Sequence, residues 1–262
     1  MPVSFPVSRR KTKSAIALLL TFTAGIVDII AYILVYHTFV AHMTGTTVHL
    51  GNELASTHWT GLATSATVLL SYIGGSVLGR SIIEFGSRTH RRTVASITLI
   101  AEALLVLFFV WAFPATIPPG HTQPASIGET CGLLALLASA MGIQTATLTR
   151  IGPLTIHTTF VTGMLNKLAQ SASQWMFWVH DNWRKHRKTR LALLGSGSQP
   201  SFRNAQLMTA IWCCYMVGSV TGTWMQSRWS ATALYLPVAL LIFSAVIDQM
   251  QPLSIEEEAD QP

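Results

Sequence analysis

The chain has 262 residues, of which 50% are hydrophobic and only 11% are charged. A soluble domain carries roughly 25% charged residues, so this chain has too little charge to cover a water-exposed surface of its size. The composition therefore excludes an ordinary soluble protein and indicates an integral membrane protein.

Six apolar runs are long enough to cross a bilayer, because a hydrocarbon core about 30 Å thick needs roughly 20 apolar residues in a helix. The runs do not alternate with the period of two that barrel strands show. The sequence therefore predicts an all-α integral membrane protein with about six transmembrane helices, surrounded by a lipid bilayer. The runs cover residues 14–35, 62–83, 94–113, 131–149, 207–225 and 231–247.

Lys and Arg residues predict the orientation, because they favour the cytoplasmic side of short loops. They occur in the N-terminal tail, at the end of the second run and in the fourth connection, while only Arg228 lies on the opposite side. This distribution places both termini in the cytoplasm and accounts for the net charge of +6, so we do not expect nucleic acid as a partner. The first run is longer than the apolar part of a signal peptide, about 7–15 residues, and we expect it to remain uncleaved in the cell membrane.

The two halves of the chain share an order of short motifs. Each half has a span, a Thr-Gly segment, a Gly-x-x-x-Gly span and a third span, and a Tyr precedes each Gly-x-x-x-Gly by three residues (Tyr72 and Tyr215). Three spans per half is an odd number, so the halves must have opposite orientations, as in the inverted repeats common among transporters. The motifs are Thr44-Gly45 and Thr162-Gly163, and then Gly75 with Gly79 and Gly218 with Gly222.

This repeat divides the chain into regions. A basic cytoplasmic tail (1–13) precedes the first three-helix repeat (14–113), and an external linker (114–130) leads to the second (131–250). The second repeat contains a basic cytoplasmic insertion (180–205), and an acidic cytoplasmic tail follows (251–262).

Both Thr-Gly segments are too polar to be ordinary spans. Irregular backbone at membrane depth occurs only inside protein or along a water-filled cavity, so we expect two broken or re-entrant segments that turn at Thr-Gly and meet near the midplane. The alternative is an amphipathic surface helix on each side. For the Gly-x-x-x-Gly spans, small residues four apart allow close helix packing, within the bundle or, alternatively, in a homodimer.

Several stretches resemble a known family. They are AGIVD at 24–28, FVAHMTGTTV at 39–48, GIQ at 142–144 and TTFVTG at 158–163. The chain is similar, from about residue 14 to 247, to the YoaK-like bacterial family with domain of unknown function 1275, which commonly has Asn where this chain has Thr46. The resemblance implies a multi-span membrane protein and no assigned activity.

Two intramembrane carboxyls are candidates for solute or coupling-ion binding. A carboxyl at membrane depth costs about 2.5–3.5 kcal/mol and points to function by default, so Asp28 is a candidate proton carrier, or alternatively a structural hydrogen-bonding group, and Glu102 has the same two interpretations. The other candidates for solute binding are Thr44, Gly45, Gln144, Thr162, Gly163 and Asn166. No metal-binding, cofactor-binding or enzyme motif is present, and we expect none of these functions.

Three functions remain open from the sequence. A transporter for an unknown small solute, with proton coupling through Asp28 as one form, fits the inverted repeat best. A passive channel or facilitator would have the same fold without coupling. A non-transporting membrane scaffold or sensor would bind no solute and would carry its Thr-Gly segments as surface helices.

Overall fold

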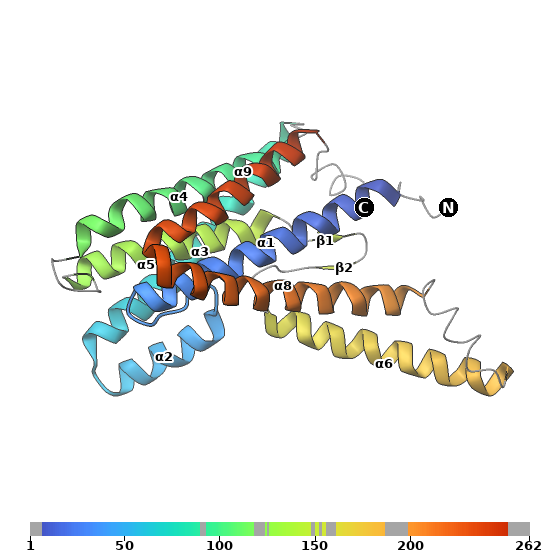
Figure 1. Ribbon diagram of the computed structural model, residues 1–262. Helices are drawn as coiled ribbons and strands as arrows, with labels where there is room; N and C mark the ends of the chain where they lie inside the picture. The colour runs from blue at the N-terminus through green and yellow to red at the C-terminus, as the bar shows by residue number, and fades with distance from the viewer. Residues whose placement is uncertain are drawn as a thin grey trace.

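A computed structural model of the protein describes residues 7–89, 93–117, 124, 126–147, 150–151, 154–155, 161–186 and 199–250, and Figure 1 shows their arrangement. Several expectations lie outside these residues. They concern the start of the basic tail (1–6), most of the external linker, residues 156–160 before the second Thr-Gly pair, the middle of the basic insertion (187–198) and the acidic tail (251–262).

The described part of the chain is almost entirely helical. The exceptions in regular structure are two strands of two residues each, which pair antiparallel between α5 and α6. The elements in order are α1 (Val7–Leu34), α2 (Met43–Ala55), α3 (Trp59–Arg88), α4 (Val94–Thr116), α5 (Ile127–Thr147), β1 (Arg150–Ile151), β2 (Leu154–Thr155), α6 (Val161–His186), α8 (Pro200–Trp229), η2 (Ser230–Leu234) and α9 (Tyr235–Met250).

Five helical stretches among the described residues are long and apolar enough to cross a membrane. Four of them are α1 from Thr12 onward, α3, α4 and α5. The fifth, Pro200–Met250, has 51 residues and comprises α8, η2 and α9, which contain the last two predicted runs. The prediction of a helical membrane protein is confirmed.

The fifth stretch is divided where α8 ends. As a continuous helix it would be about 77 Å long at 1.5 Å per residue, more than twice the hydrocarbon thickness. Ser230 has φ 49°, a left-handed conformation that interrupts an α-helix, and the short 3₁₀-helix η2 follows it. Figure 1 shows that the chain turns back here, so that α9 returns across the molecule.

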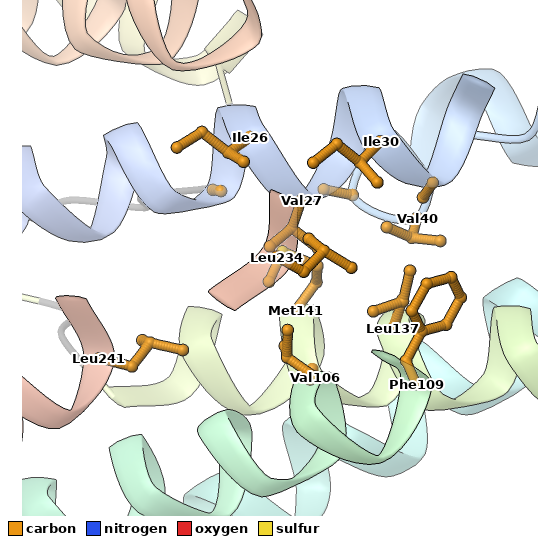
Figure 2. Close-up of a cluster of buried hydrophobic side chains, with 14 of the residues drawn as sticks. Ile26, Val27, Ile30, Val40, Val106, Phe109, Leu137, Met141, Leu234 and Leu241 are labelled. Carbon is orange, nitrogen blue, oxygen red and sulfur yellow. The ribbon is translucent and has the colours of Figure 1, made fainter. Parts of the chain in front are cut away.

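The core is formed by α1, α4, α5, η2 and α9. Figure 2 shows side chains from these elements meeting in one apolar cluster, among them Ile30, Phe109, Met141 and Leu241. Val40 belongs to the segment between α1 and α2, yet it points into the same cluster and is fully buried. That connection is therefore part of the packed interior.

The remaining helices pack around this core in two similar arrangements. α3 packs on α5 and carries α2 on its other side, while α8 packs on α1 and carries α6. Figure 1 shows α2 and α6 along the same side of the molecule, extending in opposite directions with their N-terminal ends nearest each other.

Helices extend beyond the apolar runs. α4 continues through Pro114 to Thr116, and α5 begins at Ile127, because hydropathy marks only the part of a helix that lies in hydrocarbon. A reciprocal capping box starts α5: the backbone N–H of Ser126 donates to Glu129 at 3.0 Å, and the N–H of Glu129 donates to the Ser126 hydroxyl at 3.2 Å.

Candidate functional site

The carboxyl of Asp28 joins three parts of the structure. Asp28 lies in α1, well before its end at Leu34, and is 1% exposed. After α1 the chain reverses through Tyr36 and His37, which both have left-handed φ angles of 52° and 50°. The reversed chain runs back along α1, and the backbone N–H groups of Val40 and Ala41 donate to Asp28 Oδ1 at 2.8 and 2.9 Å.

The second carboxyl oxygen accepts two side-chain hydrogen bonds. His42 Nδ1 lies 2.7 Å from Asp28 Oδ2, and the Tyr215 hydroxyl in α8 donates to the same oxygen at 2.6 Å. Val40, Ala41 and Tyr215 donate to the carboxyl, and an ionised carboxylate, which only accepts hydrogen bonds, would fit the fourth bond with the proton on His42 Nδ1. This bond raises the pKa of His42 above its ordinary value of 6.5, against the opposing effect of burial. The network ties α1, α8 and the start of α2 together.

A related contact without a carboxyl lies between α3 and α5. The hydroxyls of Tyr72 and Thr145 are 2.9 Å apart. Tyr72 lies three residues before Gly75 just as Tyr215 lies three residues before Gly218, and Thr145 follows Gly142 as Asp28 follows Gly25. The two Tyr residues thus bond to positions that correspond in the two halves, one of them an Asp and the other a Thr.

Glycines bring the same two helix pairs into backbone contact. A Cβ at Gly25 would overlap the carbonyl oxygen of Tyr215, and a Cβ at Gly142 would overlap that of Tyr72. In the opposite direction, a Cβ at Gly218 would overlap the carbonyl oxygen of Phe22 and one at Gly75 that of Ser139. In both helix pairs, the glycines allow backbone to pack directly on backbone.

A cavity of about 840 Å³ lies beside these contacts, within the 300–1,000 Å³ typical of small-molecule sites. It joins the end of α1 and the reversed segment after it, one face along α2, the N-terminal half of α3, Thr145 of α5 and the first residues of α6. Its lining combines aromatic rings, hydroxyls, imidazoles and one carboxyl. Aromatic members are Tyr32, Tyr36, Phe39 and Tyr72; polar and titratable members are His37, Thr38, His42, Thr44, Thr46, His49, Glu53, Thr64, Ser65, Thr145 and Thr162; the others are Ala41, Met43, Gly45, Gly61 and Val161.

The Thr-Gly pairs lie in helices and form no separate turns. Thr44 and Gly45 are in the first turn of α2, and Thr162 and Gly163 are in the first turn of α6. The N-cap of α2 is His42, and no side chain caps that end of the helix. The chain reverses before α2 begins, because the left-handed residues Tyr36 and His37 and the hydrogen bonds to Asp28 set the turn there.

The residues predicted from the sequence make up only part of this site. Thr44, Gly45 and Thr162 line the cavity, and Asp28 bonds to its His42. Gly163 is half-buried and Asn166 is exposed, and neither is a lining residue.

Two predicted site residues lie in the bundle, away from the cavity lining. Gln144 is buried in α5, and its amide N–H donates to the carbonyl oxygen of Leu20 in α1 at 2.6 Å. Glu102 is fully buried in α4, and its two carboxyl oxygens have no hydrogen-bond partner in the described part of the chain. Neither residue lines the cavity.

The sequence analysis missed several lining residues. Thr145, Thr64 and Ser65 belong to no recognised motif. In the predicted repeat, Thr145 stands three residues after Gly142 as Asp28 stands three residues after Gly25, which is the one signal that could have indicated it. The cluster of four histidines was a weaker signal for the cavity. His37, His42 and His49 line it, while His58 bonds to Glu53 at 3.3 Å. Across the described ranges, no group of three His, Cys, Asp or Glu side chains could hold a metal ion.

The apolar spans, the buried polar network and the cavity define a helical membrane protein with an internal polar site. Comparison with known proteins gives the family. The family described as "Protein of unknown function (DUF1275)" matches residues 16–247, and the chain belongs to this family. It is 27% identical to the UPF0700 transmembrane protein YoaK of Bacillus subtilis (strain 168), over 91% of this chain and 95% of that protein. No solved structure matches the chain.

Proposed function

We propose that the protein transports a small solute across the cell membrane and that the solute binds in the 840 Å³ cavity. The observation that carries the proposal is the position of this cavity: it lies between membrane-spanning helices and is lined by Thr44 of α2 and Thr162 of α6. A cavity within the bilayer that is lined by aromatic rings together with hydroxyls and imidazoles can hold water or a small ligand with polar groups. We propose no catalytic role.

An inverted repeat supports transport. Tyr72 and Tyr215 occupy matched positions in the two halves. The glycines at which α3 packs on α5 match those at which α8 packs on α1. We propose that α1–α4 and α5–α9 are two repeats of opposite orientation, with α2 and α6 as their re-entrant helices. In such transporters the substrate site lies near the midplane, where broken helices meet, and one repeat moves against the other.

Asp28 and His42 form the proposed coupling site for a proton. Both groups titrate, and their bond connects the start of α2, which lines the cavity, to α1 and α8. The other titratable groups around them are Tyr215 on the same carboxyl oxygen and His37, His49 and Glu53 along the cavity. The matched contact between α3 and α5, Tyr72 with Thr145, has no carboxyl, so we propose that the proton is bound at the contact between α1 and α8 alone.

Single-cysteine accessibility tests the proposed path. Thr44→Cys and Thr162→Cys are made in a chain whose Cys131, Cys213 and Cys214 are replaced by Ala, and a membrane-impermeant maleimide is applied from either side. We expect both positions to react through water, and the side from which they react to change with pH or with a bound solute.

Two matched positions give the limits of reactivity. Ser56→Cys, at the exposed end of α2, is the water-exposed control, and Leu70→Cys, 70% exposed on α3, is the lipid-facing control. If Thr44→Cys and Thr162→Cys react as slowly as Leu70→Cys, the cavity holds no water path. If each reacts from one fixed side under all conditions, the protein is a scaffold or sensor.

The His42 pair predicts the direction of the pH effect. Because the pKa of His42 is raised, the attraction to Asp28 is complete below the ordinary pKa of 6.5 and is lost as the pH rises through the raised value. We expect the labelling rate at Thr44→Cys, normalised to Ser56→Cys, to rise with pH over that window. The substitution His42→Gln should abolish this change, whereas His49→Gln should retain it. A pH profile unaffected by His42→Gln would favour a passive facilitator.

A further inference from the structure

α6 has one covered face and one open face. Met164 and Ser171 are buried against the bundle, and the Trp175 ring contacts the Phe202 ring of α8 at 5.2 Å between centroids. The opposite side of the first four turns is exposed. We call this the α6 stripe, and it consists of Thr162, Asn166, Ala169, Gln170 and Ser173.

The α6 stripe lies at membrane depth. α6 and α8 run side by side in opposite directions, as Figure 1 shows, and the contact of Trp175 with Phe202 sets their register. Thr162 is as far from Trp175 as Tyr215 is from Phe202, so at the same rise per residue the two are level. Gln170 is likewise level with Leu207, where the apolar part of α8 begins, so Thr162 to Gln170 lie at membrane depth and Ser173, level with Asn204, lies at its edge.

Contact with hydrocarbon is energetically unfavourable for the α6 stripe. Thr, Asn, Gln and Ser side chains carry donors and acceptors that lipid tails cannot satisfy. On α8 the exposed side chains at the same level include Gln206 and Thr209, so the polar surface continues onto that helix. The exposed side chains of α3, such as Val77 and Leu78 at 58% and 59% exposure, are apolar. The α6 stripe is therefore a polar surface of the single chain that needs a protein or water partner within the bilayer.

The chemistry of the α6 stripe fits a second copy of the same chain. Its members are uncharged, and Asn166 and Gln170 each offer both a donor and an acceptor, so the surface is complementary to itself across a twofold axis. Ala169 and Ser173 have the small-xxx-small spacing that lets two helices approach closely in a membrane. A charged partner surface would leave its charge unpaired here.

We propose that the protein is a homodimer in which the α6 stripes of two copies pack against each other. Thr162, the first residue of the stripe, lines the cavity, so the second copy lies at the edge of that cavity and separates it from lipid. This inference depends on the polarity and depth of α6 and does not depend on whether the cavity transports a solute.

Disulfide cross-linking in native membranes tests the interface. Ser173→Cys and Ala169→Cys are made separately in the Cys-free chain and oxidised with copper phenanthroline. We expect a dimer band on a non-reducing gel for both. Val77→Cys on α3 and Val220→Cys on α8, which are exposed and apolar, are the matched controls and should remain monomeric.

Replacing the amides tests the cause. Asn166→Leu with Gln170→Leu removes the polar pairs on both copies, and we expect the cross-linked fraction at Ser173→Cys to fall about tenfold, with a monomer mass in lipid nanodiscs. If this double variant fails to fold, the single-cysteine result decides alone. Ready labelling of Ser173→Cys by an impermeant maleimide without cross-linking would mean that the stripe faces water. Neither labelling nor cross-linking would mean that something else covers it, and either result overturns the proposal.

Discussion

Two carboxyls, Asp28 and Glu102, are buried in membrane-spanning helices, and their surroundings differ. An intramembrane carboxyl costs about 2.5–3.5 kcal/mol on insertion scales. Asp28 offsets this cost with four hydrogen bonds of 2.6–2.9 Å. The oxygens of Glu102 have no such bond in the described structure. Asp28 is therefore the carboxyl whose charge state can hold or release other elements.

Replacing Asp28 should destabilise the protein markedly. In Asp28→Asn the amide keeps one acceptor oxygen but turns an N–H₂ group toward His42 and Tyr215, which are donors. Hydrogen bonds to charged groups contribute about 1.5–3 kcal/mol each, and we expect the free energy of unfolding to fall by about 3 kcal/mol. Reversible unfolding in mixed detergent and SDS micelles measures this change.

The matched control is Thr145→Val, which removes the single neutral hydrogen bond to Tyr72. We expect it to cost about 1 kcal/mol. Equal effects of the two substitutions would contradict an ionised Asp28 that holds three elements together.

At this scale the sequence predicted Asp28 but not its partners. A carboxyl inside an apolar run stands out because its burial is costly. The donors come from Val40, Ala41 and His42, beyond a chain reversal, and from Tyr215 in the second half of the chain. Contacts between residues so far apart in the sequence arise only from tertiary packing. His42 could therefore be recognised as one of several histidines but not as the partner of Asp28.

Helix pairs in this molecule are built around glycines with different roles. Gly75 in α3 lies directly on the backbone of Ser139, whereas its neighbour Gly74 has no other atom within 4 Å of where a Cβ would lie. Only one of two adjacent glycines is therefore needed for packing.

Substituting the two glycines separately should give opposite results. In Gly75→Ala the new methyl would overlap the Ser139 carbonyl and force α3 and α5 apart, at a cost of about 1–3 kcal/mol. Gly74→Ala should be neutral or stabilise by up to about 1 kcal/mol, because Ala favours the helix more than Gly does. Unfolding of both variants in the same micelles measures the difference. If Gly75→Ala is as stable as Gly74→Ala, α3 and α5 do not pack backbone to backbone.

The elements were predictable in proportion to their hydropathy. The spans were found because a lipid-facing helix needs a long apolar run. α2 and α6 were recognised only as polar segments, because polar and apolar residues are mixed along both helices; Val48 of α2 and Leu165 of α6 are exposed beside polar side chains. The start of α5 was missed although Ser126 and Glu129 have the spacing of a capping box. The predicted boundary was set at the start of the apolar run, which lies further along the chain.

The whole molecule combines two symmetric helix pairs with an asymmetric charge distribution. α3 on α5 and α8 on α1 correspond to each other in their glycine contacts. The second half carries the basic insertion, while the first half carries the cluster of histidines at positions 37–58. Hydropathy could indicate the spans because it acts along the chain, and the distribution of Lys and Arg along the chain predicts the orientation. The cavity could not be predicted, because it depends on how the reversed segment after α1 packs against α2, α3 and α6.

Orientation in the membrane gives a prediction for the whole molecule. If Lys and Arg set the topology, the ends of the helices alternate between the two sides. In the Cys-free chain, Ser56→Cys after α2 and Ser227→Cys near the end of α8 should react with an impermeant maleimide in intact cells. Thr89→Cys after α3 and Asp181→Cys in α6 should react only after the cells are permeabilised. All four positions are exposed in the structure, so a missing signal reports the side of the membrane and not burial. Labelling of Ser56→Cys and Thr89→Cys from the same side would mean that α3 does not cross the bilayer, whereas the reverse pattern at all four positions would place the basic segments outside and overturn the charge argument.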